Sequence, residues 1–212
     1  TALAAPAITN TPMAMKNRPI GMSAVLIKGI ARTPDRPAVC EPMISDVASA
    51  DMIMIPGGPG QTEAMQDQAF MAEVKRLGEG ATYNTSVCTG SLILAAAGLI
   101  TGKRAGSHWA YRELLAMFGA IPDDARVVRD GNVITGGGVT AGIDIALTIA
   151  AELAGEDVAK MIQLAIEYAP APPFNCGRPE IAEEKTVAAV KQLFSAFAQQ
   201  RREAIEHLTG AA

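Results

Sequence analysis

The sequence is poor in several features that define whole classes of protein. Aromatic residues make up only 4% of the 212 residues, so a buried core must be built from Ala, Ile, Leu, Val and Met. The formal net charge of -4 removes the basic surface that nucleic-acid binding requires. No apolar run reaches the roughly 18 residues that a membrane-spanning helix needs. We therefore expect neither a nucleic-acid partner nor a membrane partner.

Cysteine and histidine are also scarce. The three cysteines, Cys40, Cys88 and Cys176, are odd in number and far apart, which is typical of a reducing compartment rather than of a disulfide framework. The two histidines, His108 and His207, form no metal-binding spacing with each other or with cysteine. The sequence therefore predicts a cytoplasmic protein without a metal site, and His207 is expected to be solvated near the end of the last helix.

Strand and helix patterns alternate along the chain. Short apolar runs predict strands at 22–30, 51–60 and 82–87, and an Asp-Gly turn predicts a β-hairpin over 125–137. Helical spacing of apolar residues covers 61–78, 91–97, 109–118, 140–153, 156–168 and 181–208. The proline-rich stretch at 169–180 cannot be helical. This alternation predicts a single α/β domain over residues 1–212 with a mostly parallel sheet.

One cysteine falls at the corner between a predicted strand and a predicted helix. The stretch NTSVCTGSLILAAAG (84–98) places Cys88 where ligands of open α/β sheets bind, at the carboxyl end of a strand. A sharp turn there pushes the side chain outward, and the start of a helix is expected to lower the pKa of the thiol. Cys88 is therefore a candidate nucleophile, with a buried, inert cysteine as the alternative. Cys40 and Cys176 have no helix behind them and are expected to be structural.

Glycine-rich segments flank this corner. Gly58, in the PGGPG loop, and Thr89 are expected to offer backbone N–H groups to a developing negative charge, while Gly90 permits close backbone approach. His108 either orients the thiol or caps and packs the helix that follows it. The segment GGGVTAG (136–142) matches no phosphate-binding pattern, so its backbone is expected to pack against the Cys88 turn.

Taken in order, IPGGPG, SVCTGSLILAAAGLITGKRA, SHWAY and GGGVTAGID resemble the ThiJ/PfpI superfamily. The segments VVRDGNVITGGGVTAGID and QLAIEYAPAPPFNCGRPE narrow the resemblance to its isocyanide (isonitrile) hydratases, over about residues 51–202. The resemblance implies a flavodoxin-like three-layer α/β sandwich of the class I glutamine amidotransferase-like type. It also implies a homodimer with no cofactor and no metal.

The resemblance further implies a reaction and a set of site residues. Water adds to a small apolar isocyanide and gives an N-substituted formamide, through a thioimidate on the cysteine. Carried over to this sequence, Cys88 is the nucleophile and Thr89 its hydroxyl neighbour. Val139 and Gly137 lie in the loop whose backbone supports the cysteine turn.

The chain departs from the family pattern at its start. The family's proton shuttle is an acidic residue after the first strand, and here the matching stretch TALAAPA has Ala4 in that place. We therefore expect the N-terminal strand of the family to be missing or altered in this sequence. We expect the chain to be an excerpt of a longer protein, with an altered first segment or a divergent member as alternatives. Asp51 and Glu63 are the possible replacement acids near the PGGPG loop.

Two other classes of function remain open on the sequence. One is a different cysteine-dependent enzyme of the superfamily, a glyoxalase or peptidase-like hydrolase, which would depend more strongly on His108. The other is a catalytically lapsed redox-sensing or ligand-sensing protein, in which Cys88 would oxidise selectively.

Overall fold

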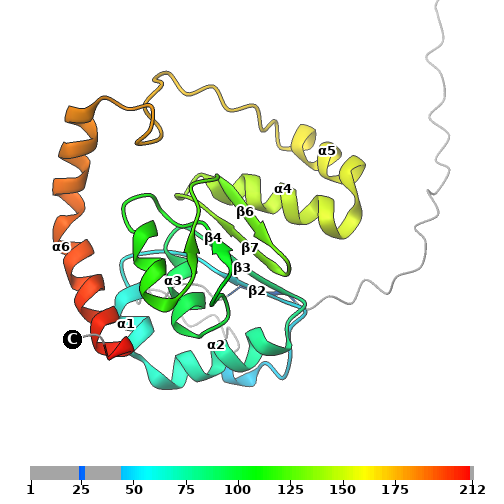
Figure 1. Cartoon of the computed structure of the whole chain (residues 1–212). Coiled ribbons are helices and arrows are strands. Elements are labelled where there is room, and N and C mark those ends of the chain that lie inside the picture. Colours follow the sequence, from blue (N-terminus) through cyan, green and yellow to red (C-terminus); the bar gives the residue numbers. More distant parts are fainter. Residues whose placement is uncertain (1–23, 27–43, 211–212) are drawn as a thin grey trace, which may run out of the picture.

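The structure is a computed structural model that describes residues 24–26 and 44–210 (Figure 1). Ala4 and Cys40 lie outside the described residues, as do both flanks of the strand predicted at 22–30. Within the described part, the expected flavodoxin-like arrangement of helices around a mostly parallel sheet is present.

The main sheet contains five described strands in the order β1-β2-β3-β7-β6. The strands are β1 (Ala24–Leu26), β2 (Met52–Ile55), β3 (Tyr83–Val87), β6 (Val127–Asp130) and β7 (Val133–Gly136). β1, β2, β3 and β7 are parallel, and β6 joins β7 as the predicted antiparallel hairpin, with Gly131 at φ 62 in its turn. A small second sheet pairs β4 (Arg104–Ala105) with β5 (Ile121–Pro122). The carboxyl ends of β2, β3 and β7 therefore meet at one edge.

The sheet has a hydrophobic core on each face. Successive side chains of a strand point to opposite faces, so Ile53 and Ile55 enter one cluster while Met52 enters the other. The first cluster is covered by α1 (Gln61–Gln66), α2 (Gln68–Gly80), α3 (Gly90–Ala96) and the 3-10 helix η2 (Arg112–Phe118). The second cluster is covered by α4 (Ala141–Ala154), through Ile145 and Ile149. Helices on both faces of a sheet make the predicted three layers.

Two helix predictions need correction. The helix predicted at 61–78 is broken at Asp67, whose side chain instead caps α2 by accepting a hydrogen bond from the Phe70 N–H at 3.0 Å. α2 continues past Gly78 to Gly80. The helix predicted at 109–118 is the 3-10 helix η2, entered through turns in which Tyr111 N–H bonds His108 O and Leu114 N–H bonds Tyr111 O.

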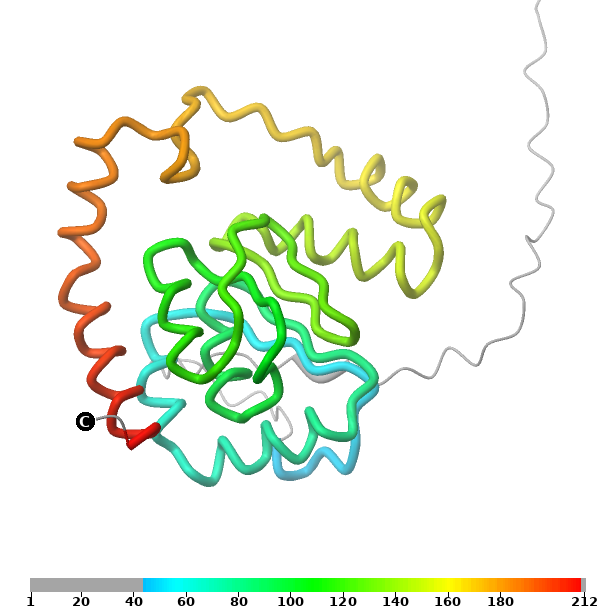
Figure 2. Tube along the Cα trace, in the orientation of Figure 1, coloured from blue at the N-terminus to red at the C-terminus, as the bar shows by residue number. Residues whose placement is uncertain are grey.

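The last part of the chain runs around the outside of the sheet layers (Figure 2). α5 (Glu156–Ala165) packs on α4, and the proline-rich segment 169–183 then leads to α6 (Glu184–Thr209). The C-terminal part of α6 returns to the body, where Arg201, Ala204 and Ile205 are buried. Among the helices of residues 44–210, none combines the length and apolar character that crossing a membrane requires.

Candidate active site

Cys88 lies on a strained turn between β3 and α3. Its φ of 59 is in the left-handed region, which residues with a side chain seldom adopt. Its N–H donates to the carbonyl oxygens of Gly137 at 2.8 Å and Gly136 at 3.2 Å. Its own carbonyl accepts from the hydroxyls of Ser107 at 3.1 Å and Ser91 at 3.3 Å. These bonds hold the backbone in the geometry of a nucleophile elbow, and the shortest of them joins Cys88 to Gly137.

The PGGPG loop presses directly against this turn. A Cβ on Gly57 would lie 2.6 Å from Thr89 N and 2.9 Å from Cys88 Cβ, so only glycine fits there. A Cβ on Gly90 would overlap the carbonyl oxygen of Ile55, which confirms the predicted close approach. The N–H of Gly58 donates to Thr89 Oγ1 at 3.2 Å. The loop after β2 and the turn after β3 therefore form one packed unit.

The pKa of Cys88 moves in the direction opposite to the prediction. Burial raises the pKa of the thiol, and this effect exceeds the hydrogen bonds from the Thr89 backbone and hydroxyl and the charge of Arg201, all of which lower it. α3 has only seven residues, so its N-terminus is a weak source of positive potential. Cys88 consequently rests as a thiol at neutral pH.

A buried cation that the sequence analysis missed lies behind the loop. Arg201 is 4% exposed, and its Nε donates to Gln61 Oε1 at 3.1 Å while Nη2 donates to the Gly58 carbonyl at 3.2 Å. Its guanidinium carbon lies 4.2 Å from the centre of the Tyr111 ring, which is a cation–π contact. Nη1 is buried and has no hydrogen-bond partner among the residues that the structure describes. The signal in the sequence was an arginine on the apolar stripe of the last helix.

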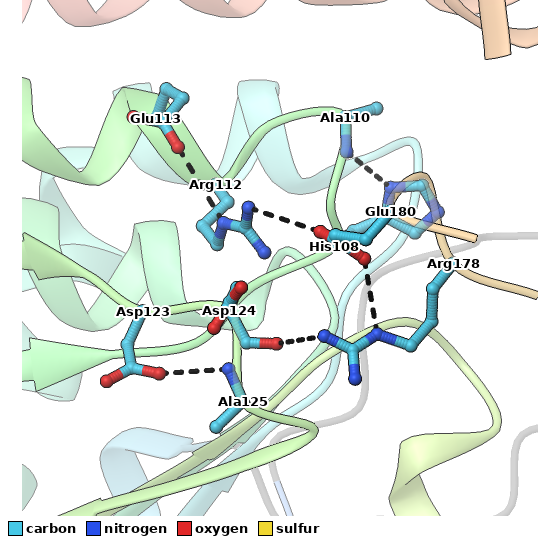
Figure 3. Close-up of polar contacts among 9 residues, drawn as sticks. All are labelled: His108, Ala110, Arg112, Glu113, Asp123, Asp124, Ala125, Arg178 and Glu180. Carbon is cyan, nitrogen blue, oxygen red and sulfur yellow. Dashed lines mark hydrogen bonds and ion pairs between the residues drawn. The ribbon is translucent and has the colours of Figure 1, made fainter. Parts of the chain in front are cut away.

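His108 packs in an aromatic cluster. Its ring lies edge-on to Phe194 at 5.6 Å and near Tyr111 at 5.6 Å. Its Nδ1 accepts a hydrogen bond from the N–H of Ala110 at 3.3 Å (Figure 3). Because Nδ1 accepts, the proton of the neutral ring is on Nε2. Burial, followed by the charge of Arg201, lowers the pKa of His108. The ring contacts with Phe194 and Tyr111 favour the packing alternative.

The remaining predicted residues are dispersed. Val139 is in the expected loop but is 79% exposed. Glu63 is exposed on α1, and Asp51 precedes β2, at the end of the sheet opposite Cys88. Cys176 is an exposed free thiol and His207 is exposed as predicted. Within residues 24–26 and 44–210, no group of three or more His, Cys, Asp or Glu is placed to hold a metal ion.

The proline-rich segment, which is distant from Cys88 in the sequence, is held near the elbow by polar contacts. Arg178 donates from Nε to Glu180 Oε2 at 3.2 Å and from Nη2 to the carbonyl of Asp124 at 3.3 Å, and Arg112 Nη2 lies 3.9 Å from Glu180 Oε1 (Figure 3). Together with Gly137 these four residues line a cleft of about 70 Å³. Because Arg112, Arg178 and Glu180 bring charged side chains into its lining, the cleft is not the mostly apolar pocket that would suit a hydrocarbon isocyanide.

The fold and the elbow define a class of protein, a flavodoxin-like α/β protein with a cysteine at the carboxyl edge of its sheet. The DJ-1/PfpI family matches residues 25–152, and the chain belongs to this family. It is 50% identical to the isonitrile hydratase of Pseudomonas putida over 76% of this chain and 71% of that protein.

More distant relatives agree on the family. The chain is 33% identical to dj-1beta of Drosophila melanogaster, over 50% of this chain and 58% of that protein. A crystal structure of a ThiJ/PfpI family protein from Pseudomonas syringae is 44% identical and superposes with a TM-score of 0.73, covering 76% of this chain and 67% of that one. These comparisons confirm the predicted superfamily and fold.

Proposed function

We propose that this chain is an enzyme that hydrates isocyanides to N-substituted formamides, with Cys88 as its nucleophile. The observation that carries the proposal is the 50% identity to an isonitrile hydratase over most of the chain. The left-handed backbone of Cys88 supports it, because strain of this kind is retained where a side chain has to be presented to a substrate.

The raised pKa of Cys88 suits the first step. In additions to an isocyanide, the nucleophile and a proton both become bonded to the terminal carbon. A protonated thiol supplies both, the sulfur as the nucleophile and the S–H group as the source of the proton. The sulfur lone pair forms the C–S bond, the S–H bond breaks, and its proton ends on the same carbon, which gives R–N=CH–S–Cys88. A neutral thiol therefore meets the atom balance of this step without a separate carboxylic acid at the position of Ala4.

Water completes the reaction. It adds to the carbon of the thioimidate, the nitrogen receives a proton, and the C–S bond breaks to release R–NH–CHO. The sulfur leaves as a thiolate and regains a proton. Hydrogen bonds from Thr89 to the sulfur and the nearby charge of Arg201 favour this anion. The net change is one isocyanide plus one water to one formamide.

The test is formation of formamide from an aromatic isocyanide. We expect turnover in the wild type, a loss of at least about 10³-fold in Cys88→Ala, and no change in the control Cys176→Ala, which removes the exposed thiol. In ¹⁸O-labelled water the formamide oxygen should be labelled. A folded wild-type protein that forms no formamide from aromatic or aliphatic isocyanides would contradict the proposal.

The proposed enzyme is a homodimer. Support comes from large apolar side chains left exposed on α5, on the segment after it and on α6: Met161 at 69%, Leu164 at 82%, Phe174 at 74% and Leu193 at 71%. Sedimentation at micromolar concentration should show a dimer, and Leu164→Glu should weaken it. Ile121→Glu, at an exposed residue of β5, is the control. A wild-type monomer contradicts the dimer.

A further inference from the structure

Arg201 is a buried cation. Among the described residues, no carboxylate forms an ion pair with its guanidinium group. Two of its nitrogens bind uncharged oxygens, those of Gln61 and Gly58, and Nη1 binds nothing. Burial of a charge is unfavourable unless another group compensates it. We infer that the charge of Arg201 is compensated by a negative charge that forms only during the reaction.

The contacts of Arg201 lead through Gly58 to Thr89, the neighbour of Cys88 in the chain. Arg201 Nη2 donates to the Gly58 carbonyl at 3.2 Å, and the N–H of Gly58 donates to Thr89 Oγ1 at 3.2 Å. Thr89 directly follows Cys88, and its hydroxyl is one of the groups that lower the pKa of the Cys88 thiol. The carbonyl and the N–H of Gly58 belong to two successive peptide groups, so these two bonds fix the position of Gly58 between Arg201 and Thr89. The hydroxyl oxygen of Thr89 therefore faces the N–H of Gly58.

Neighbouring residues fix the guanidinium so that it cannot turn away. The Gln61 side chain is 4% exposed and is itself held, because Nε2 donates to Met65 Sδ at 3.1 Å. The Tyr111 ring covers one face of the guanidinium at 4.2 Å. The positive charge therefore has one position relative to the PGGPG loop.

We propose that Arg201 is a positioning residue for Cys88: it holds Gly58 against Thr89 and supplies the positive charge that balances the sulfur anion expelled in the last step. The inference deepens the proposed function and rests on Cys88 being the nucleophile. It assigns a role in the cysteine site to a residue of α6, more than a hundred residues away in the sequence.

The experiment measures alkylation of Cys88 by iodoacetamide, followed on the Cys88 peptide by mass spectrometry from pH 6.5 to pH 10. This readout needs no isocyanide, so it distinguishes failure of this inference from failure of the proposed hydration. Arg201→Met removes the charge and the donors, and Arg201→Lys keeps the charge. The control is Arg202→Met, because Arg202 is the adjacent arginine and is exposed.

We expect Arg201→Met to slow alkylation at pH 8 by at least about threefold, equal to half a pKa unit, and to move the profile to higher pH. Arg201→Lys should restore most of the rate at pH 8, while Arg202→Met should match the wild type. A profile of Arg201→Met within twofold of the wild type at every pH overturns the proposal. Failure of both Arg201→Met and Arg201→Gln to fold, judged by circular dichroism, also overturns it, since Arg201 would then be a structural residue.

Discussion

The N–H of Cys88 and the carbonyl oxygen of Gly137 lie 2.8 Å apart as a hydrogen-bonded pair. The two residues follow β3 and β7, which are neighbouring parallel strands. The pairing of the two strands thus holds Cys88 at its φ of 59. The intrinsic backbone preference of a residue with a side chain disfavours this left-handed conformation. The strained turn is a product of tertiary structure.

This strain predicts an inverted order of stability at position 88. Cys88→Gly should unfold with a free energy about 1 kcal/mol higher than Cys88→Ala, because glycine adopts a positive φ without steric cost. At an ordinary position the order is reversed. Urea unfolding of the two variants measures the difference, and an alanine variant that equals or exceeds the glycine variant would show that the turn is unstrained.

Gly90 tests the packing of the turn on the PGGPG loop. Gly90→Ala should lower the free energy of unfolding by at least about 3 kcal/mol, because the new methyl group meets the backbone of Ile55, which cannot move without shifting β2.

Gly80→Ala is the matched control for this packing. Gly80 ends α2, and a Cβ there meets nothing within 4 Å, so this variant should be neutral or more stable by up to about 1 kcal/mol. Equal effects of the two substitutions, measured by chemical unfolding, would rule out the predicted contact.

Thr89 lowers the pKa of Cys88 through its backbone and its hydroxyl, and only the hydroxyl can be removed by substitution. Thr89→Val should therefore raise the pKa of the thiol further, and slow alkylation of Cys88 at pH 8 by about threefold to tenfold. Thr89→Ser keeps the hydroxyl and should stay near the wild type. The rate of Cys88 alkylation against pH checks this, and a serine variant as slow as the valine variant would mean that the methyl group, not the hydroxyl, matters.

Much of the fold followed from local patterns. The apolar runs of β2 and β3, the turn at Gly131 and the end of η2 at Gly119, which has φ 76, depend on neighbours in sequence. The break at Asp67 was missed because a single aspartate can lie inside a helix or cap the next one, and its hydrogen bond to the N–H of Phe70 decides between them.

The site could be predicted only in part. The elbow at Cys88 and the close approach at Gly90 follow from a strand, a turn and a glycine. The raised pKa of Cys88 does not, because burial depends on every element packed around the sulfur. Arg201 was missed because its partner Gly58 lies in another region of the sequence, although its place on an apolar helix face was visible.

His108 gives a pH dependence of stability that separates packing from catalysis. Because burial and Arg201 lower its pKa, the folded protein resists protonation there. As pH falls below about 6.5, the unfolded chain binds a proton at this residue that the folded protein does not, so stability is lost toward the lowered pKa. His108→Gln should reduce the loss of unfolding free energy between pH 7.5 and pH 5.5, measured in urea. His207→Gln, at an exposed residue of α6, should leave that loss unchanged.

The same His108→Gln variant should keep the alkylation profile of Cys88, and a profile displaced to higher pH would instead favour a hydrolase with a cysteine–histidine pair.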